Sequence, residues 1–394
     1  MKRRYLQSKG NRRGFSLRHA VGRLLKSGQA VSAPDYILVG VIAIIVLTGV
    51  LMLSSASSVK SFHNFDGDTY VYFRHQLLYG LLPGTLAFLV MAKLDYRRWQ
   101  RYTLHFLIVA VLLLLLVFIP GLKAEFGTAQ SWVSIGGASF QPSEFVKLFL
   151  ILFLAGWFTE RGEEFTRDFW NGVLPFAVIL GAIALLIALQ PDFGTLVVVA
   201  GIALTIYFVA GARWRHLLGL VIAGGGIFGL LLSRSSHTVQ RLLTFLNPEL
   251  DPQGIGYHIN QAFLAVGSGG LFGLGFGQSR QKFAYLPEVM GDSIFAIIAE
   301  EMGFAFACGL IVLFLVILWR SLRIIRGVED DYARLIIAGV ISWLLFQAFF
   351  NIAAMLGLLP LTGIPLPLMS YGGSAMMAML AALGIVVNIS THAR

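Results

Sequence analysis

The chain has 394 residues, of which 57% are hydrophobic and only 13% are charged, and its formal net charge is +10. A soluble domain of this length normally carries about twice that charged fraction, so the composition excludes an ordinary water-soluble enzyme. The single cysteine, Cys308, excludes an internal disulfide, and no Cys/His cluster has metal-site spacing. The positive charge does not indicate nucleic-acid binding, because the basic residues flank apolar segments and do not form one patch.

Apolar blocks of about twenty residues dominate the sequence, and this length matches a hydrocarbon core about 30 Å thick. The blocks lack the alternation of membrane-barrel strands. The sequence therefore predicts an all-α integral membrane protein with about ten transmembrane helices and a large extracytoplasmic loop between spans seven and eight. The spans are expected at residues 36–55, 75–93, 103–120, 143–158, 172–189, 193–210, 216–233, 293–318, 334–357 and 373–390.

The distribution of Lys and Arg predicts the orientation. Most of the 30 basic residues fall on the side of the N-terminus, which the positive-inside rule places in the cytoplasm. Ten spans return the C-terminus to the same side. The predicted organisation is a basic cytoplasmic tail at 1–35, a polytopic membrane domain at 36–390 and a cytoplasmic C-terminus at 391–394.

The long outer loop, residues 234–292, contains aromatic and aliphatic residues along its whole length. Loops of this size in compact proteins are usually functional or disordered, and the apolar content argues against disorder. We expect the loop to fold back as partly re-entrant or interfacial helix.

Two sites near the outer ends of spans carry charged residues. Charges at membrane depth are costly unless they are paired or hydrated, so they indicate function. Glu144 and Lys147 are spaced to share a helical face, as an ion pair that is either functional or only structural. Asp192, in the corner between spans five and six, is either functional or an N-cap for span six.

A third acidic site lies where the long loop meets span eight. Asp292 ends the loop and can act there as a general base, or it caps the helix. Glu300 and Glu301 lie two turns deeper, and their simpler interpretation is hydrogen bonding to neighbouring helices. The loop's end, with Arg280, Lys282 and Glu288 nearby, favours the functional interpretation for Asp292.

Six segments, in order, resemble the SEDS family (shape, elongation, division and sporulation), and the resemblance covers about residues 36–390. The chain looks most similar to the FtsW and SpoVE types, whereas RodA is less similar. Two positions depart from the family pattern: Met290-Gly291 replaces His-Thr before the aspartate, and Ser131 replaces Arg before Trp132. The segments are QPSEFVKLF (141–149), QPDFGT (190–195), NPELDPQGIGYHINQA (247–262), GQSRQKFAYLPE (277–288), IFAIIAEEMG (294–303) and GIPLPLMSYGGS (363–374).

The resemblance implies a peptidoglycan glycosyltransferase that polymerises lipid II, an undecaprenyl-diphosphate disaccharide-pentapeptide, into β-1,4 glycan with inversion. Asp292 occupies the family's catalytic position. Cations or a metal must stabilise the diphosphate leaving group, so a magnesium or manganese ion is a candidate cofactor. The expected substrate-binding residues are Glu144, Lys147, Arg241, Arg280, Lys282 and Glu288.

The resemblance also implies partners and a location. A class B penicillin-binding protein transpeptidase and other division or elongation membrane proteins are the expected partners, in the bacterial plasma membrane and at the division septum. Two other interpretations stay open: a lipid II flippase, and a non-catalytic divisome scaffold. The outward position of the charges argues against a transporter, whose sites usually lie near the bilayer midplane.

Overall fold

The computed structural model describes residues 32–126, 129–135, 138–234 and 236–393. Most of the predicted tail, residues 1–31, lies outside the described residues, as does residue 394 of the predicted C-terminus. The division of the chain into a tail, a membrane domain and a C-terminus therefore stays a prediction.

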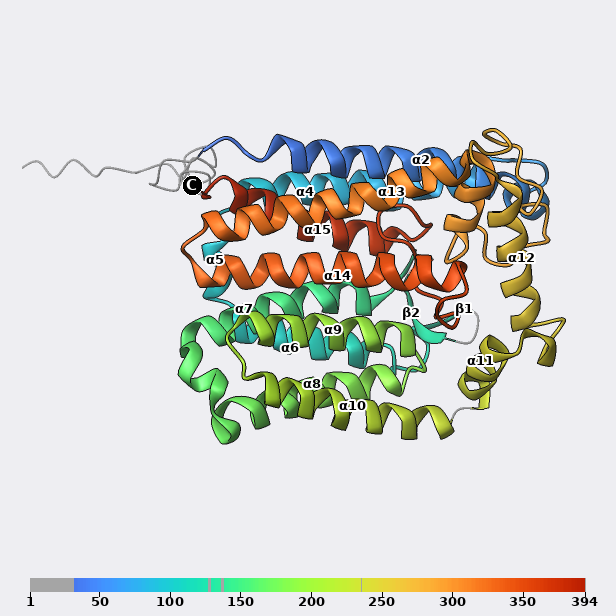
Figure 1. Cartoon of the computed structure of the whole chain (residues 1–394). Helices are drawn as coiled ribbons and strands as arrows, with labels where there is room; N and C mark the ends of the chain where they lie inside the picture. The colour runs from blue at the N-terminus through green and yellow to red at the C-terminus, as the bar shows by residue number, and fades with distance from the viewer. Residues whose placement is uncertain (1–31, 127–128, 136–137, 235, 394) are drawn as a thin grey trace, which may run out of the picture.

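The described chain is a bundle of roughly parallel and antiparallel helices, with α11 and α12 lying across one end (Figure 1). The α-helices are α2 (Tyr36–Asn64), α3 (Val71–Gln76), α4 (Leu82–Lys93), α5 (Arg97–Gln100), α6 (Thr103–Leu116), α7 (Pro142–Arg167), α8 (Leu174–Ala188), α9 (Phe193–Val209), α10 (Trp214–Arg234), α11 (Ser236–Leu246), α12 (Ile255–Ser268), α13 (Ile294–Gly327), α14 (Asp331–Met355) and α15 (Gly373–Ser390). Short turns of other helix types are η1 (Leu77–Leu81), η2 (Phe169–Val173) and η3 (Pro248–Leu250).

The predicted membrane-protein class is confirmed. Seven helical segments in the described chain are long and apolar enough to span a bilayer, and three shorter apolar helices accompany them. All ten coincide with predicted spans, but the count of ten stays a prediction because the three are short. The seven are Tyr36–Asn64, Val71–Lys93, Pro142–Arg167, Phe169–Ala188, Ile294–Gly327, Asp331–Met355 and Gly373–Ser390, and the shorter ones are Thr103–Leu116, Phe193–Val209 and Trp214–Leu230.

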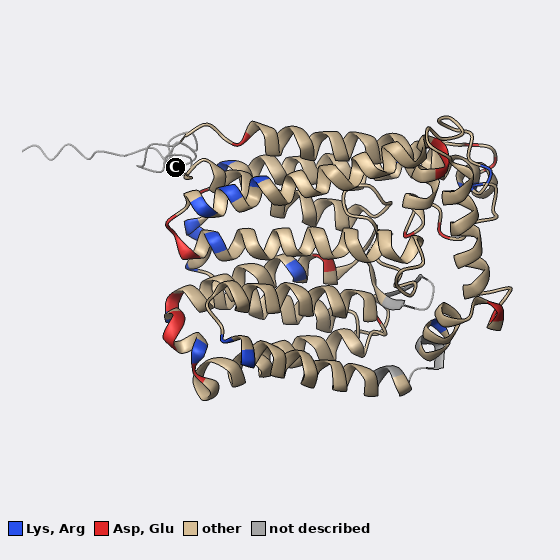
Figure 2. Cartoon of the chain, in the orientation of Figure 1, with Lys and Arg blue, Asp and Glu red and all other residues tan. Residues whose placement is uncertain are grey.

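The core lies where α7, α14 and α15 meet. About four-fifths of the apolar window of each of these helices is buried, whereas the buried share is 28% for the segments that contain α8 and α13. Large apolar side chains such as Leu86, Leu185 and Leu315 cover the outside of the bundle, as a lipid solvent requires. Figure 2 shows that Lys and Arg gather at the end of the bundle where the C-terminus lies, and this agrees with the predicted basic side.

One strand-containing element was not predicted. Between α6 and α7 the chain forms a three-stranded antiparallel sheet of β1 (Lys123–Phe126), β2 (Ala129–Ile135) and β3 (Ala138–Phe140), in the order β1-β2-β3. Val133 pairs with Lys123 on one side and with Phe140 on the other, and its side chain is fully buried. The sheet ends next to Gln141, where α7 begins, so it helps to position the start of that helix.

The predicted helical content of the outer loop is confirmed by α11, η3 and α12. Its relation to the membrane surface stays a prediction. After α12, the glycine-rich segment 269–275 enters a break in α13 at Gly303, whose φ is 81°. Leu274 N and Gly275 N donate to the carbonyl oxygens of Glu300 and Glu301 at 3.0 Å each. The break therefore ties the outer loop to the first turns of α13.

Candidate functional site

Asp292 lies directly before α13, and backbone contacts fix its position. Asn351, near the end of α14, donates through Nδ2 to the backbone oxygen of Asp292 at 2.7 Å and to that of Ile364 at 2.8 Å. The N-cap position of α13 is held by Ser293. The interpretation of Asp292 as an N-cap is therefore wrong, and its carboxylate is not committed to the helix end.

The connection between α14 and α15 holds the other side of the aspartate loop. Ser370 Oγ donates to the carbonyl oxygen of Gly291 at 2.6 Å and accepts from Leu366 N at 2.8 Å. Tyr371 N donates to the carbonyl oxygen of Met290 at 2.8 Å. The backbone on both sides of the carboxylate is thus clamped, which is the rigid support that a catalytic group needs.

The surroundings of Asp292 make its carboxyl group hard to ionise. Burial, followed by the negative charge of Glu288, raises its pKa to about 7, and Arg241 opposes this shift. Burial, followed by Arg241, lowers the pKa of His258 to about 4, so this imidazole is neutral at pH 7. A carboxyl group with a pKa near 7 is suited to exchange protons at physiological pH.

His258 extends the polar surroundings of the aspartate. Its Nε2 lies 2.7 Å from Ser293 Oγ, and that hydroxyl donates to the carbonyl oxygen of Pro287 at 2.8 Å. A Ser293 hydroxyl that donates to Pro287 leaves its oxygen free to accept a hydrogen bond from the ring. Through Ser293, α12 is connected to the turn that presents Asp292.

The predicted substrate-binding cations differ in accessibility. Arg280 is exposed and Arg241 is half-buried, and the charge of Arg241 acts on Asp292. Lys282 is buried, with its Nζ 3.2 Å from Glu301 Oε1, 2.7 Å from the Gly277 carbonyl oxygen and 3.0 Å from Ser55 Oγ. Its role toward substrate stays a prediction, because the described contacts already use its ammonium group.

Glu300 and Glu301 anchor the segment 277–282. Glu301 accepts from Gly277 N and Ser279 N, and Glu300 accepts from Arg280 N at 2.9 Å. Hydrogen bonding to a neighbouring helix, the simpler interpretation, is correct only for Glu301, which accepts from Ser55 of α2 at 2.6 Å. The main partner of both carboxylates is the loop.

Glu144 and Lys147 form the predicted ion pair, with Nζ 2.8 Å from Oε1 and each side chain 2% exposed. Lys147 Nζ also lies 3.3 Å from Gln347 Oε1 and 4.9 Å from the centre of the Trp343 ring. Glu144 Oε2 has no hydrogen-bond partner among the described residues. The pair is therefore a closed internal cluster between α7 and α14.

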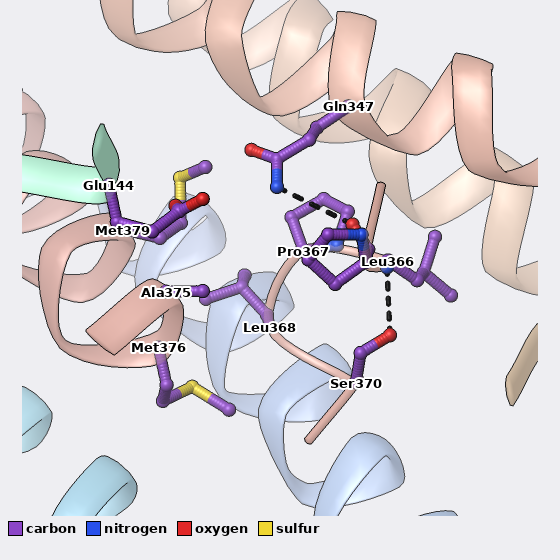
Figure 3. Close-up of a pocket in the computed structure, with 10 residues that line it drawn as sticks. Glu144, Gln347, Leu366, Pro367, Leu368, Ser370, Ala375, Met376 and Met379 are labelled. Atoms are coloured by element: carbon purple, nitrogen blue, oxygen red, sulfur yellow. Dashed lines mark hydrogen bonds between the residues drawn. The ribbon is translucent and has the colours of Figure 1, made fainter. Parts of the chain in front are cut away.

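The Glu144 carboxylate points into a small cavity of about 10 Å³ (Figure 3). Gln347, Leu366 and Ser370 also line it. Ser370 also donates to Gly291, so the segment 365–370 contacts both the ion-pair cluster and the residues before Asp292.

The structure also places three other residues that the sequence singled out. Asp192 caps α9 by accepting from Thr195 N at 3.0 Å, as its simpler interpretation expects. Glu288 is exposed, with Lys60 Nζ 3.9 Å away. Ser131 is buried and its Oγ accepts from Gln141 Nε2 at 3.5 Å, so this departure from the family pattern is packed beside the start of α7.

The other departure, Met290-Gly291, is tolerated without strain. Met290 is 5% exposed, and a Cβ on Gly291 would meet atoms of Glu288 no closer than 3.6 Å. In the described part of the chain, no three His, Cys, Asp or Glu side chains gather as a metal site.

Sequence reasoning did not identify Ser370, Asn351 or His258 as parts of the site. His258 and Ser370 lie in segments that carried the family resemblance, and Asn351 lies within the apolar helix α14. The available signal was a polar residue within or next to an apolar helix, since a polar group there must find a partner.

Comparison with known proteins is consistent with this arrangement. The model of the FtsW, RodA and SpoVE family, described as cell cycle proteins, matches residues 35–394. Stage V sporulation protein E of Bacillus subtilis is 41% identical over 364 residues, covering 92% of this chain and 98% of the relative. The probable peptidoglycan glycosyltransferase FtsW of Trichlorobacter lovleyi is 36% identical, covering 90% and 93%.

Two solved structures share the fold. A chain of a peptidoglycan synthase complex, studied for its structural coordination of polymerization and crosslinking, superposes with a TM-score of 0.75 at 30% identity and covers 91% of this chain and 98% of its own. The rod shape determining protein RodA of Thermus thermophilus gives a TM-score of 0.66 at 30% identity, covering 91% and 97%.

Proposed function

Since this chain belongs to the FtsW, RodA and SpoVE family of cell cycle proteins, we propose that it is a peptidoglycan glycosyltransferase that polymerises lipid II. The curated relatives named as peptidoglycan glycosyltransferases support this assignment. The single structural observation that carries it is Asp292, whose backbone is clamped directly before α13 and whose carboxyl pKa is raised to about 7.

The reaction joins the 4-hydroxyl of an acceptor sugar to the anomeric carbon of a donor. Asp292 takes the hydroxyl proton, the new glycosidic bond forms opposite the leaving group, and the bond to the lipid diphosphate breaks with inversion. A carboxylate serves the same purpose when it activates the nucleophile in inverting glycosidases. Arg241 lies close enough to influence Asp292, and Arg280 is an exposed cation of the same loop that could contact the diphosphate.

The contribution of a divalent cation is a separate part of the proposal. Magnesium usually takes one or two carboxylates, with water and substrate phosphates as its other ligands. A magnesium or manganese ion on the lipid diphosphate would therefore take most of its ligands from outside the protein. No step above depends on it.

The proposed setting is the bacterial plasma membrane, at the division septum, with both termini in the cytoplasm. A class B penicillin-binding protein is the proposed partner, supported by the neighbour's origin in a complex of polymerization and crosslinking.

The test of catalysis is polymerisation of labelled lipid II by the purified protein with its cognate transpeptidase. Asp292→Asn should lower the rate about 10²–10⁴-fold, the usual contribution of a general base. The parent rate should rise as pH increases through about 7, because a raised pKa keeps the carboxyl group protonated, and inactive, below that value.

The matched control is Asp66→Asn, the same substitution at an exposed turn residue, which should keep the parent rate. Polymerisation by Asp292→Asn at the parent rate would disprove the catalytic assignment. A parent protein that never polymerises, even with its partner, would favour a scaffold, and lipid II movement without polymer would favour a flippase.

A further inference from the structure

A cleft is lined by the start of α2, the last turns of α13 and the end of α15. These segments lie at the end of the bundle where the C-terminus lies (Figure 1). Its volume is about 410 Å³. The lining residues that matter here are Ser32, Asp35, Ile37, Arg320, Arg323 and Ile324.

The cleft carries a net positive charge. Asp35 and Arg320 neutralise each other, with Nη2 2.6 Å from Oδ2, and their side chains are 7% and 14% exposed. Arg323 is exposed, and no carboxylate in the described chain lies within ion-pair distance of it. Its guanidinium stacks 4.5 Å from the centre of the Trp319 ring, which orients it without neutralising its charge.

The cleft lies at a depth that suits a lipid headgroup. From the break at Gly303 to Arg323, α13 rises about 30 Å, close to the thickness of a hydrocarbon core. Trp319 and Tyr36 are 52% and 72% exposed, and such rings are enriched where a membrane meets water. Ile37, in the wall of the cleft, is 51% exposed and offers an apolar surface for an acyl chain.

We propose that this cleft binds the headgroup of an anionic phospholipid, with Arg323 contacting the phosphate. Basic pockets between transmembrane helices are suited to anionic headgroups. The exposed side chain of Ile37 in the cleft wall favours a lipid over a free anion, because a free anion gains nothing from an apolar surface. The site is independent of the proposed glycosyltransferase activity.

The test is binding of phosphatidylglycerol to the purified full chain, monitored by native mass spectrometry in a mild detergent. Arg323→Gln should weaken binding about fivefold, the effect of one basic residue near an anionic headgroup. The matched control is Arg326→Gln, an exposed arginine on the same helix that does not line the cleft, and it should bind as the parent does. Added salt should weaken binding to the parent, since the contact is ionic.

Three results would overturn the proposal. These are equal loss of binding in both variants, equal retention of phosphatidylcholine and phosphatidylglycerol by the parent, and full competition by inorganic phosphate. Because Arg323 is exposed, its substitution should leave folding intact, and the elution profile of each variant on size exclusion checks this.

Discussion

Replacing Lys147 with methionine should destabilise the protein strongly. The substitution roughly keeps the length of the side chain but removes the cation that neutralises Glu144. The side chain of Glu144 is only 2% exposed, so water cannot replace that cation. Glu144 Oε2 already lacks a hydrogen-bond partner in the described chain, so no neighbouring donor there compensates the negative charge at that oxygen. Breaking a buried pair by removing one partner costs about 3–5 kcal/mol, and we expect a loss of that size.

The double variant Glu144→Gln with Lys147→Met should recover much of this loss. Replacing both members removes the unpaired charge, and such replacements are often close to neutral. The assay is the free energy of unfolding in mixed detergent micelles, measured for the parent, both single variants and the double variant. Arg167→Met is the matched control, because Arg167 pairs with Glu163 on the same helix but is 49% exposed, and it should cost about 1 kcal/mol or less.

The same five proteins, the Arg167→Met control included, separate a structural pair from a substrate contact. If Lys147→Met costs no more than Arg167→Met, the pair is not buried as described and the reasoning fails. If the double variant folds and polymerises lipid II near the parent rate, the predicted contact of Lys147 with substrate is wrong. If it folds but does not polymerise, that contact gains support.

Three other predictions concern the topology, the break in α13 and the partner. In a Cys308→Ala background, a cysteine at the exposed position Ser268 should react with an impermeant thiol reagent in intact spheroplasts and one at Glu329 should not; the reverse pattern would invert the topology. Gly303→Ala should severely reduce the folded yield, because φ is 81° and a Cβ would lie 2.2 Å from Gly273 N; a normal yield by fluorescence-detected size exclusion would contradict the described break. The cognate class B transpeptidase should co-purify with the chain in gentle detergent, and separate elution of two folded proteins would count against the proposed partnership.

The sequence predicted those parts of the structure that depend on local spacing. The Glu144–Lys147 pair follows from positions three apart on one helix, and Asp192 precedes a helix as a capping residue must. The apolar blocks predicted helix positions well, although α2 and α13 continue to Asn64 and Gly327. Polar and basic residues extend these helices past the ends expected from hydropathy, because helix turns beyond the apolar block can be solvated by water.

Contacts between distant segments were beyond this reasoning. Lys282 appeared available to substrate because nothing in its neighbourhood revealed the pairing with Glu301 and Ser55, which tertiary structure alone brings together. The sheet was missed because its strands are short and interrupted, and only the alternation around Val133 hinted at it. The role of Ser370 was also hidden, because its hydrogen bond to Gly291 joins positions 79 residues apart.

The break at Gly303 limits how the glycine-rich segment 269–275 can move. Amide hydrogens in a glycine-rich connection normally exchange with solvent rapidly, but those of Leu274 and Gly275 are held by carbonyl oxygens inside α13. Their release requires the separation of the segment from the helix, so their exchange should be as slow as that of helix amides. The connection therefore cannot swing away as an independent flap while these two bonds hold.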